Sequence, residues 1–210
     1  MMSGMKEALT LLMLVAIGTN AVMGHQDCGD ISPTVPPKDL HKIHGHWILV
    51  ADFAHSPEAG QVFSNMTSSH VELDLLPDNH TVKYTESNLF QNKSCITYFM
   101  NATVHADEHT LQIEPHSLLD VDGVTRKIIE QGNVTFHETC TNCLILVYRG
   151  GYGNFLLAYR KEGHHDDVTQ IDKGHADLKR LAECLGILHE SDFHFNKNAE
   201  LCGQKSPAED

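Results

Sequence analysis

Nine short runs rich in β-branched and aromatic residues, separated by turn residues, constrain the fold of this 210-residue chain more than any other feature. They predict strands at Trp47–Ala54, Ser69–Leu76, Thr81–Ser87, Cys95–Val104, Thr110–Glu114, Val124–Glu130, Val134–Thr139, Leu144–Arg149 and Phe155–Arg160. Turn residues such as Pro77-Asp78-Asn79 and Asp122-Gly123 stand between them. Short strands at this spacing predict an antiparallel all-β sandwich or barrel.

One segment near the C-terminus has helical periodicity instead. Leu178, Leu181, Ala182 and Leu185 recur at i, i+3, i+4 and i+7, and Gly186 can end the helix. We expect a helix from about His175 to Leu185, packed on the outer wall of the sheet. Residues 203–210 are polar and predict a disordered tail.

The N-terminus has the pattern of a secretory signal. Lys6 is followed by an apolar stretch from Ala8 to Ile17 and then by small residues, which predicts a signal peptide over residues 1–24. The apolar stretch is shorter than the roughly 20 residues needed to cross a bilayer. We therefore expect a secreted, extracellular protein without a membrane span, with one domain over residues 25–202. In that compartment its six cysteines favour disulfides.

Five Asn-x-Ser/Thr acceptor sites indicate which way the strands face. They are Asn65, Asn79, Asn92, Asn101 and Asn133. A glycan must point at solvent, so an occupied Asn marks the outer face, and alternation turns its neighbours inward. Asn101 then places Tyr98, Met100 and Ala102 inside. Asn133 places Val134, Phe136 and Glu138 inside.

Exposed charges set the facing where no acceptor site lies. We expect the charged side chains to face water; they are Lys83, Glu72, Asp74, Glu114, Arg149 and Arg160. Alternation then turns their neighbours toward the inner face: Val71, Leu73, Leu75, Val82, Tyr84, Glu86, Ile113, Tyr148 and Tyr159. Four of the five tyrosines are thus predicted to face inward, which is more typical of an amphipathic pocket than of a dry core. The alternative is that they lie near strand ends with their hydroxyls in water. The candidate ligand-binding residues are Phe53, Tyr84, Glu86, Tyr98, Met100, Ile113, Phe136, Tyr148 and Tyr159.

Several motifs resemble a known family. Gly45-His46-Trp47 followed by an apolar strand is similar to the Gly-x-Trp opening of lipocalins. The segments Lys93–Tyr98, Asn154–Tyr159 and Leu181–Ile187, with a final Cys202, resemble lipocalins of the α1-acid glycoprotein (orosomucoid) type. They also resemble the fish relatives described as tributyltin-binding and as saxitoxin- and tetrodotoxin-binding proteins. The resemblance covers essentially the whole mature chain.

This resemblance implies an eight-stranded antiparallel up-and-down barrel with a cup-shaped cavity and a C-terminal α-helix packed on its side. A barrel of about eight strands can hold one small ligand. The resemblance also implies disulfides Cys28–Cys184 and Cys95–Cys202, and it implies that Gly45 and Trp47 are structural residues at the barrel base.

The chain departs from the family pattern at three places. Cys140 and Cys143 have no counterpart, and the polar segment Glu162–Asp167 stands where the last strand should continue. Ile113 occupies the position of a basic residue in the family, whereas Glu86 falls close to the family's inward acidic position. We therefore hypothesise a pocket that prefers neutral or cationic ligands.

Two groups of residues suggest other chemistry. Cys140-x-x-Cys143 has the spacing of a redox dithiol, but its strand-like flanks favour a structural disulfide over a redox or metal site. Among sixteen histidines, His44-Gly45-His46 and His164-His165-Asp166-Asp167 are candidate metal ligands, but neither supplies a complete ligand set. Solvated surface is the favoured interpretation, and we expect no metal.

Charge and motif content exclude several classes of function. The net charge is −13 and no basic run is present, which excludes nucleic-acid binding. No catalytic arrangement has a convincing context, so we expect neither an enzyme nor a cofactor. The prediction is a monomeric secreted glycoprotein carrier that binds a small lipophilic or amphiphilic ligand, neutral or cationic, such as a xenobiotic or toxin. The alternative is an acute-phase or immunomodulatory protein whose glycosylated acidic surface contacts a cell-surface receptor.

Overall fold

The computed structural model describes residues 28–104, 109–166 and 168–203, with the backbone alone over 168–173. The predicted signal peptide and residues 204–210 of the predicted tail lie outside the described residues. No helix within the described ranges is long and apolar enough to cross a lipid bilayer.

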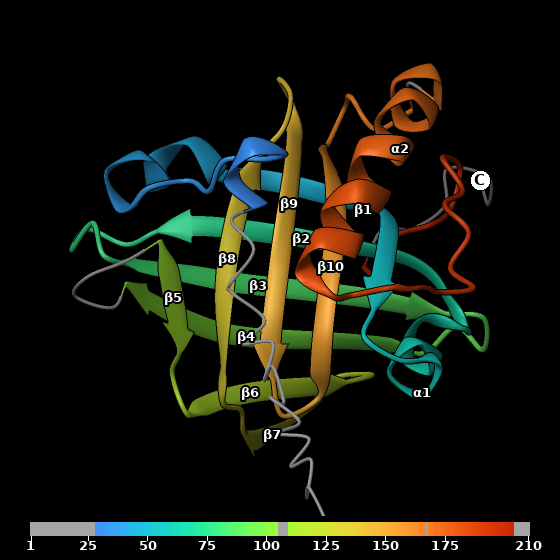
Figure 1. Ribbon diagram of the computed structural model, residues 1–210. Coiled ribbons are helices and arrows are strands. Elements are labelled where there is room, and N and C mark those ends of the chain that lie inside the picture. Colours follow the sequence, from blue (N-terminus) through green and yellow to red (C-terminus); the bar gives the residue numbers. More distant parts are fainter. Residues whose placement is uncertain (1–27, 105–108, 167, 204–210) are drawn as a thin grey trace, which may run out of the picture.

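The described chain consists mainly of antiparallel strands (Figure 1). The strands are β1 (Gly45–Ala54), β2 (Met66–Leu75), β3 (Thr81–Phe90), β4 (Cys95–Val104), β5 (Thr110–Ile113), β6 (His116–Val121), β7 (Val124–Ile129), β8 (Gly132–Glu138), β9 (Cys143–Gly150), β10 (Gly153–Lys161) and β11 (His189–Glu190). The helical segments are α1 (Pro57–Gly60), α2 (Val168–Leu185) and the 3-10 turns η1 (Cys28–Asp30), η2 (Pro37–Ile43) and η3 (Gln61–Phe63).

Eight of these strands form a closed ring. The order of neighbours is β3-β2-β1-β10-β9-β8-β5-β4, and β4 pairs again with β3 to close it. Every pairing in the ring is antiparallel. The predicted eight-stranded antiparallel lipocalin-type barrel with a C-terminal helix is therefore confirmed.

The barrel differs from the sequence prediction at two places. Strand β6, which pairs with β4 and β7, falls in a stretch where the sequence predicted no strand. The break between β5 and β6 lies at Glu114-Pro115, where proline cannot donate a backbone hydrogen bond. Strand β10 pairs with both β1 and β9, so the barrel closes without a further strand in the polar segment after Lys161.

Two apolar clusters hold the fold together, one on each side of the barrel wall. The first fills part of the interior and includes Trp47, Leu73 and Phe136. The second lies between the outer wall and α2, and it joins Phe53 and Leu156 to the predicted helical stripe of Leu178, Leu181 and Ala182. Burial of each large apolar side chain in these clusters stabilises the folded state by about 1.5–3 kcal/mol. The helix therefore packs where its periodicity predicted.

One end of the barrel is closed by η2 and Trp47. Leu40 and Ile43 of η2 belong to the interior cluster. Trp47 is 4% exposed and its Nε1–H donates a 2.8 Å hydrogen bond to the carbonyl oxygen of Ile43. Gly45 begins the strand at φ +128°, a conformation that favours glycine. Both residues thus lie where the chain enters the barrel from η2.

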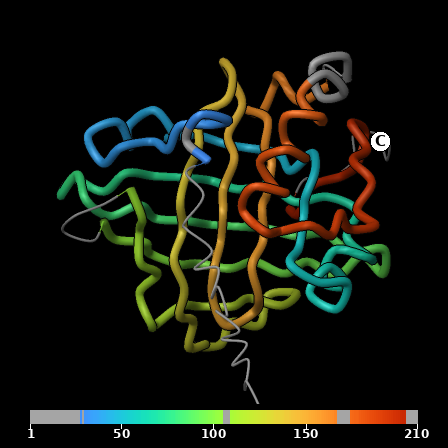
Figure 2. Tube along the Cα trace, in the orientation of Figure 1, coloured from blue at the N-terminus to red at the C-terminus, as the bar shows by residue number. Residues whose placement is uncertain are grey.

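The C-terminal segment runs back along the barrel after α2 (Figure 2). Its strand β11 pairs with Phe53 and Ala54 of β1. Disulfides Cys28–Cys184 and Cys95–Cys202 tie both terminal segments to the body, and their sequence separations are 156 and 107 residues. In the chain-entropy model, each disulfide that closes a loop this long contributes on the order of 5 kcal/mol to the free energy of unfolding.

Candidate functional site

A cavity of about 190 Å³ lies inside the barrel and is lined mainly by apolar and aromatic side chains. Residues of β3 and β4 form one wall, and residues of β8, β9 and β10 form another. Val62 and Tyr152 also line the cavity, although they are 50% and 59% exposed. The cavity is therefore open at the end that carries these two residues.

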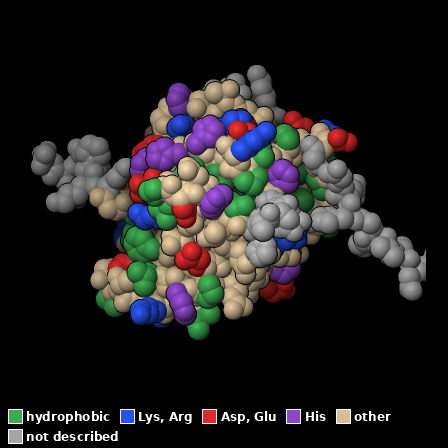
Figure 3. Space-filling view, turned by 90° about the vertical axis from the view of Figure 1, so that its left-hand side faces the viewer, with side chains coloured by type: hydrophobic (Ala, Val, Ile, Leu, Met, Phe, Trp, Pro, Cys, Tyr) green, Lys and Arg blue, Asp and Glu red, His purple; other side chains and the backbone are tan. Residues whose placement is uncertain are grey.

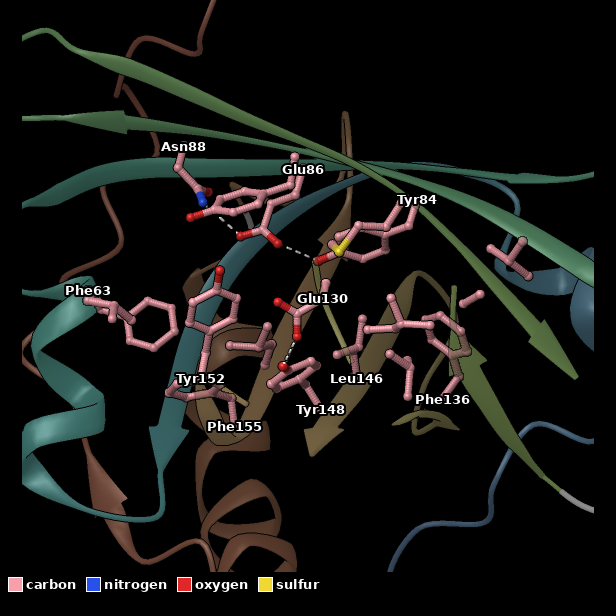
Figure 4. A pocket seen from close by; sticks show the side chains of 18 of the residues that line it. Phe63, Tyr84, Glu86, Asn88, Glu130, Phe136, Leu146, Tyr148, Tyr152 and Phe155 are labelled. Atoms are coloured by element: carbon pink, nitrogen blue, oxygen red, sulfur yellow. Dashed lines mark hydrogen bonds between the residues drawn. The ribbon is translucent and has the colours of Figure 1, made fainter. Parts of the chain in front are cut away.

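The β3 wall carries a hydrogen-bonded polar cluster of Tyr84, Glu86 and Asn88 (Figure 4). Strand alternation places all three on the inner face. The Tyr84 hydroxyl donates a 2.6 Å hydrogen bond to Glu86 Oε2, and Asn88 Nδ2 donates a 2.8 Å bond to Glu86 Oε1. Burial raises the pKa of Glu86, although both hydrogen bonds oppose that rise. Glu86 is thus a buried carboxyl group held in a fixed orientation.

A second buried carboxyl group, Glu130, lines the cavity between β7 and β8. Glu130 is 3% exposed, and its Oε1 accepts a hydrogen bond from the hydroxyl of Tyr148 in β9. Burial raises the pKa of Glu130. Burial also raises the pKa of Tyr148, and its hydrogen bond to Glu130 adds to that rise.

Aromatic rings surround these carboxyl groups. Tyr148 stacks on Phe155 with ring centroids 5.9 Å apart, and Phe63 meets Phe155 edge to face at 5.5 Å. Tyr98 of β4 faces the same space, and burial together with the charge of Glu86 raises its pKa to about 12. Such rings offer both apolar area and negatively polarised faces to a ligand.

Seven of the nine candidate ligand-binding residues line the cavity. They are Tyr84, Glu86, Tyr98, Met100, Ile113, Phe136 and Tyr148. Tyr159 is 2% exposed and belongs to the interior cluster, but it is not among the residues that line the cavity.

Phe53 does not reach the cavity. A register shift between Leu49 and Ala51 reverses the alternation of β1, so Phe53 packs in the outer cluster, 6.2 Å from the ring of His175. The inward facing expected for Glu138 is also wrong. Its side chain is 56% exposed, and Lys42 Nζ lies 3.7 Å from its Oε2.

Sequence reasoning missed other lining residues, among them Asn88, Glu130, Tyr152 and Phe155. The alternation that placed Glu86 inside also places Asn88 inside, so that signal was present in the sequence. The alternation that placed Tyr159 inside likewise places Phe155 inside, whereas Glu130 and Tyr152 lie between strands, where alternation does not apply.

The cavity lining carries negative but no positive charge within the part of the chain that the structure describes. Glu86 and Glu130 are its carboxyl residues, and it includes no Lys, Arg or His. Ile113, which occupies the position of a basic residue in the family that the sequence resembles, is part of the cavity lining. A cation would therefore meet complementary charge there, and an anion would meet repulsion.

The acceptor asparagines of the five glycosylation motifs lie away from the interior. Asn65, Asn79, Asn92 and Asn133 are exposed. Asn101 is partly exposed, and its Nδ2 donates a 3.3 Å hydrogen bond to Glu114 Oε2. Glycan attachment at these positions remains a prediction.

Cys140 and Cys143 form a disulfide with each other, as their strand-like flanks favoured. No cysteine in the described ranges is free. The same ranges contain no group of three or more His, Cys, Asp or Glu residues that could hold a metal ion. Figure 3 shows histidines at several separate places on one face, mixed with acidic and basic side chains. Asp167 of the His164–Asp167 group lies outside the described residues.

Comparison with known proteins gives close relatives in one fish species. Saxitoxin and tetrodotoxin-binding proteins 1 and 2 of Takifugu pardalis are each 33% identical to this chain over 208 residues. The alignment covers 99% of this chain and 52% of each relative. This chain is similar to toxin-binding proteins. It spans about half the length of the curated relatives it matches, and no family model matches it.

Two solved structures are also similar. The siderocalin Ex-FABP, described as functioning through dual ligand specificities, aligns with a TM-score of 0.46 and 10% identity, over 75% of this chain and 97% of that chain. A mutant of the fluorescent protein UnaG aligns with a TM-score of 0.32 and 10% identity, over 58% of this chain and 97% of that chain.

Proposed function

We propose that this protein is a secreted glycoprotein carrier of the α1-acid glycoprotein type, which binds a small amphiphilic ligand, neutral or cationic, inside the barrel. The observation that carries this proposal is the aromatic cavity with two buried carboxyl groups and no basic residue in its described lining. The similarity to two toxin-binding proteins supports it and makes a xenobiotic or toxin a suitable ligand class.

Binding in this cavity works by burial and orientation. The apolar part of a ligand leaves water among rings such as Phe63, Phe136 and Phe155. A cationic or hydrogen-bond-donating group is oriented by Glu86, which Tyr84 and Asn88 hold in place. Nothing in this scheme requires a reaction, so the protein acts as a carrier rather than as an enzyme.

Secretion and glycosylation belong to the same proposal. Three disulfides are typical of oxidising compartments. The acceptor asparagines lie on the outer surface, where glycans leave the cavity unobstructed.

The same outer surface favours a second candidate function. Four exposed acceptor asparagines and a net charge of −13 would give a glycosylated acidic surface suited to a cell-surface receptor. In that case the cavity would be secondary, and mutations in it would leave receptor binding unchanged.

Ligand titration tests the carrier proposal. Purified protein stripped of ligand is titrated with lipophilic amines, organotins, steroids and guanidinium toxins, and binding is followed by calorimetry and tyrosine fluorescence. Tyrosine emission is the relevant signal because four tyrosines line the cavity and Trp47 does not. We expect saturable binding of at least one class, with Tyr98→Ala weakening it in a protein that stays folded. Absence of binding across the panel would refute the carrier function.

A further inference from the structure

The cavity contains two separate tyrosine–carboxyl pairs. Tyr84 donates to Glu86 within β3, whereas Tyr148 of β9 donates to Glu130 at the junction of β7 and β8. Figure 4 shows both carboxyl groups directed into the same space from different elements. A ligand inside the barrel can therefore meet two anionic groups.

The position of Glu130 is built by several contacts. Its backbone N–H donates a 3.1 Å hydrogen bond to the carbonyl oxygen of Pro115, which fixes the chain where β7 ends. Tyr148 reaches Glu130 because Gly132 and Gly150 lack side chains. A Cβ on Gly132 would lie 2.8 Å from Tyr148 Cε2, and a Cβ on Gly150 would collide with the Tyr148 hydroxyl.

A purely structural role does not require Glu130 to be a carboxyl group. A glutamine would also accept the Tyr148 hydrogen bond, without the cost of burying a group that can ionise. The same holds for Glu86, which accepts from Tyr84 and Asn88. Two buried carboxyl groups without a basic residue in the described lining therefore indicate a positive partner supplied from outside the chain.

The space between the two carboxyl groups suits an organic cation. The ring of Tyr98 lines the same cavity as Glu86 and Glu130. Burial and the charges of both carboxyl groups raise the pKa of Tyr98, whereas the charge of Arg126 lowers it. Aromatic faces stabilise cations that have lost part of their water, and carboxylates bind guanidinium and ammonium groups through charge-assisted hydrogen bonds.

We propose that the cavity binds an organic dication, with one guanidinium or ammonium group on Glu86 and the other on Glu130. This inference rests on the proposed carrier function and specifies its ligand class. Aromatic side chains of the cavity lining, such as Tyr98 and Phe155, contact the part of the ligand that joins its charged ends.

A matched ligand series tests this directly. α,ω-Diguanidinoalkanes of increasing length are compared with n-alkylguanidines of the same lengths by calorimetry. At the best length we expect the diguanidine to bind about tenfold or more tightly than its monoguanidine, because a hydrogen bond to a charged group contributes roughly 1.5–3 kcal/mol. Glu86→Gln and Glu130→Gln should each abolish this advantage.

Two controls separate charge from structure. Tyr148→Phe removes the hydroxyl but keeps Glu130, so the preference for diguanidines should persist. Near-ultraviolet circular dichroism and thermal unfolding establish that each variant is folded. If Glu130→Gln weakens the binding of a neutral steroid as much as the binding of the diguanidine, Glu130 supports the shape of the cavity without binding a charge, and the proposal fails.

The remaining outcomes separate this inference from the carrier function. Equal binding of mono- and diguanidines by the native protein would overturn the dication proposal, and binding of a neutral lipophile in the same experiment would leave the carrier function standing. Failure of every probe to bind would overturn both.

Discussion

The hydroxyl of Ser191 donates a 2.7 Å hydrogen bond to Oδ1 of Asp52 and so joins the segment after β11 to a buried carboxyl group of β1. Asp52 is 3% exposed, and its Oδ2 has no partner among the described residues. Burial raises the pKa of Asp52 to about 7, an effect that the Ser191 hydrogen bond opposes and the charge of Glu190 increases. The fold therefore buries a group that prefers to stay protonated.

Asp52→Asn should make the protein more stable at alkaline pH. The folded state holds the Asp52 proton up to about pH 7, whereas an ordinary aspartate releases it near 3.8, so the contribution of Asp52 to the free energy of unfolding falls as pH rises through that interval. The interval corresponds to roughly 4 kcal/mol. Urea unfolding of both proteins across this range should show equal stability at the acidic end and a more stable variant above pH 7. If the difference in the free energy of unfolding between the two proteins does not vary with pH, ionisation of the buried Asp52 is not its cause.

Glu86→Gln should weaken the pH dependence of cation binding. Burial raises the pKa of Glu86, so the native protein loses affinity for a cation as pH falls through that raised value and the group becomes neutral. The variant should bind the same n-alkylguanidine more weakly at neutral pH, by about tenfold or more. Its remaining pH dependence should be smaller than that of the native protein, because Glu130 is then the one carboxyl residue left in the described cavity lining. Affinity for a neutral steroid should change little in either protein. Equal losses for neutral and cationic ligands would reject the charge role.

Gly150→Ala should displace the Tyr148 hydroxyl from Glu130. The added Cβ would collide with the Tyr148 hydroxyl and would lie 2.6 Å from the carbonyl oxygen of Gln131, so the tyrosine must move. Because burial and the Glu130 bond raise the pKa of Tyr148, its displacement should lower that pKa toward the ordinary value. Ultraviolet difference absorbance during an alkaline titration measures this change. Gly151→Ala is the matched control, since a Cβ there meets nothing within 4 Å. The same titration curve for both variants would disprove the steric argument.

The inner face of the barrel could be predicted wherever an exposed charge or acceptor site fixed the alternation. Lys83 outward placed Tyr84 and Glu86 inside, and Asn101 outward placed Tyr98 and Met100 inside, as the cavity shows. The prediction that Phe53 lines the cavity was wrong because a β-bulge carries no clear sequence signal. One extra residue in a strand reverses the facing of every later side chain in that strand.

Glu130 could not be assigned because its role depends on distant parts of the chain. It directly follows β7, where alternation with charged neighbours suggests an ordinary solvated residue. Its environment comes from Tyr148 in β9 and from the space left by Gly132 and Gly150. A tertiary contact between separate strands creates this site, and strand periodicity describes only one strand at a time.

Trp47→Ala should destabilise the barrel without altering the cavity. Trp47 is 4% exposed, bonds the carbonyl oxygen of Ile43, and has Lys161 Nζ 5.8 Å from its ring centroid, yet it does not line the cavity. Truncating a buried aromatic side chain costs roughly 3 to 5 kcal/mol. Trp47→Phe keeps most of the apolar volume and loses the N–H bond, so its cost should be smaller. Urea unfolding measures both losses, and calorimetry on the folded variants should give native ligand affinity. Reduced ligand affinity with unchanged unfolding would show that Trp47 serves the cavity rather than the closed end, because the structural role predicts the reverse.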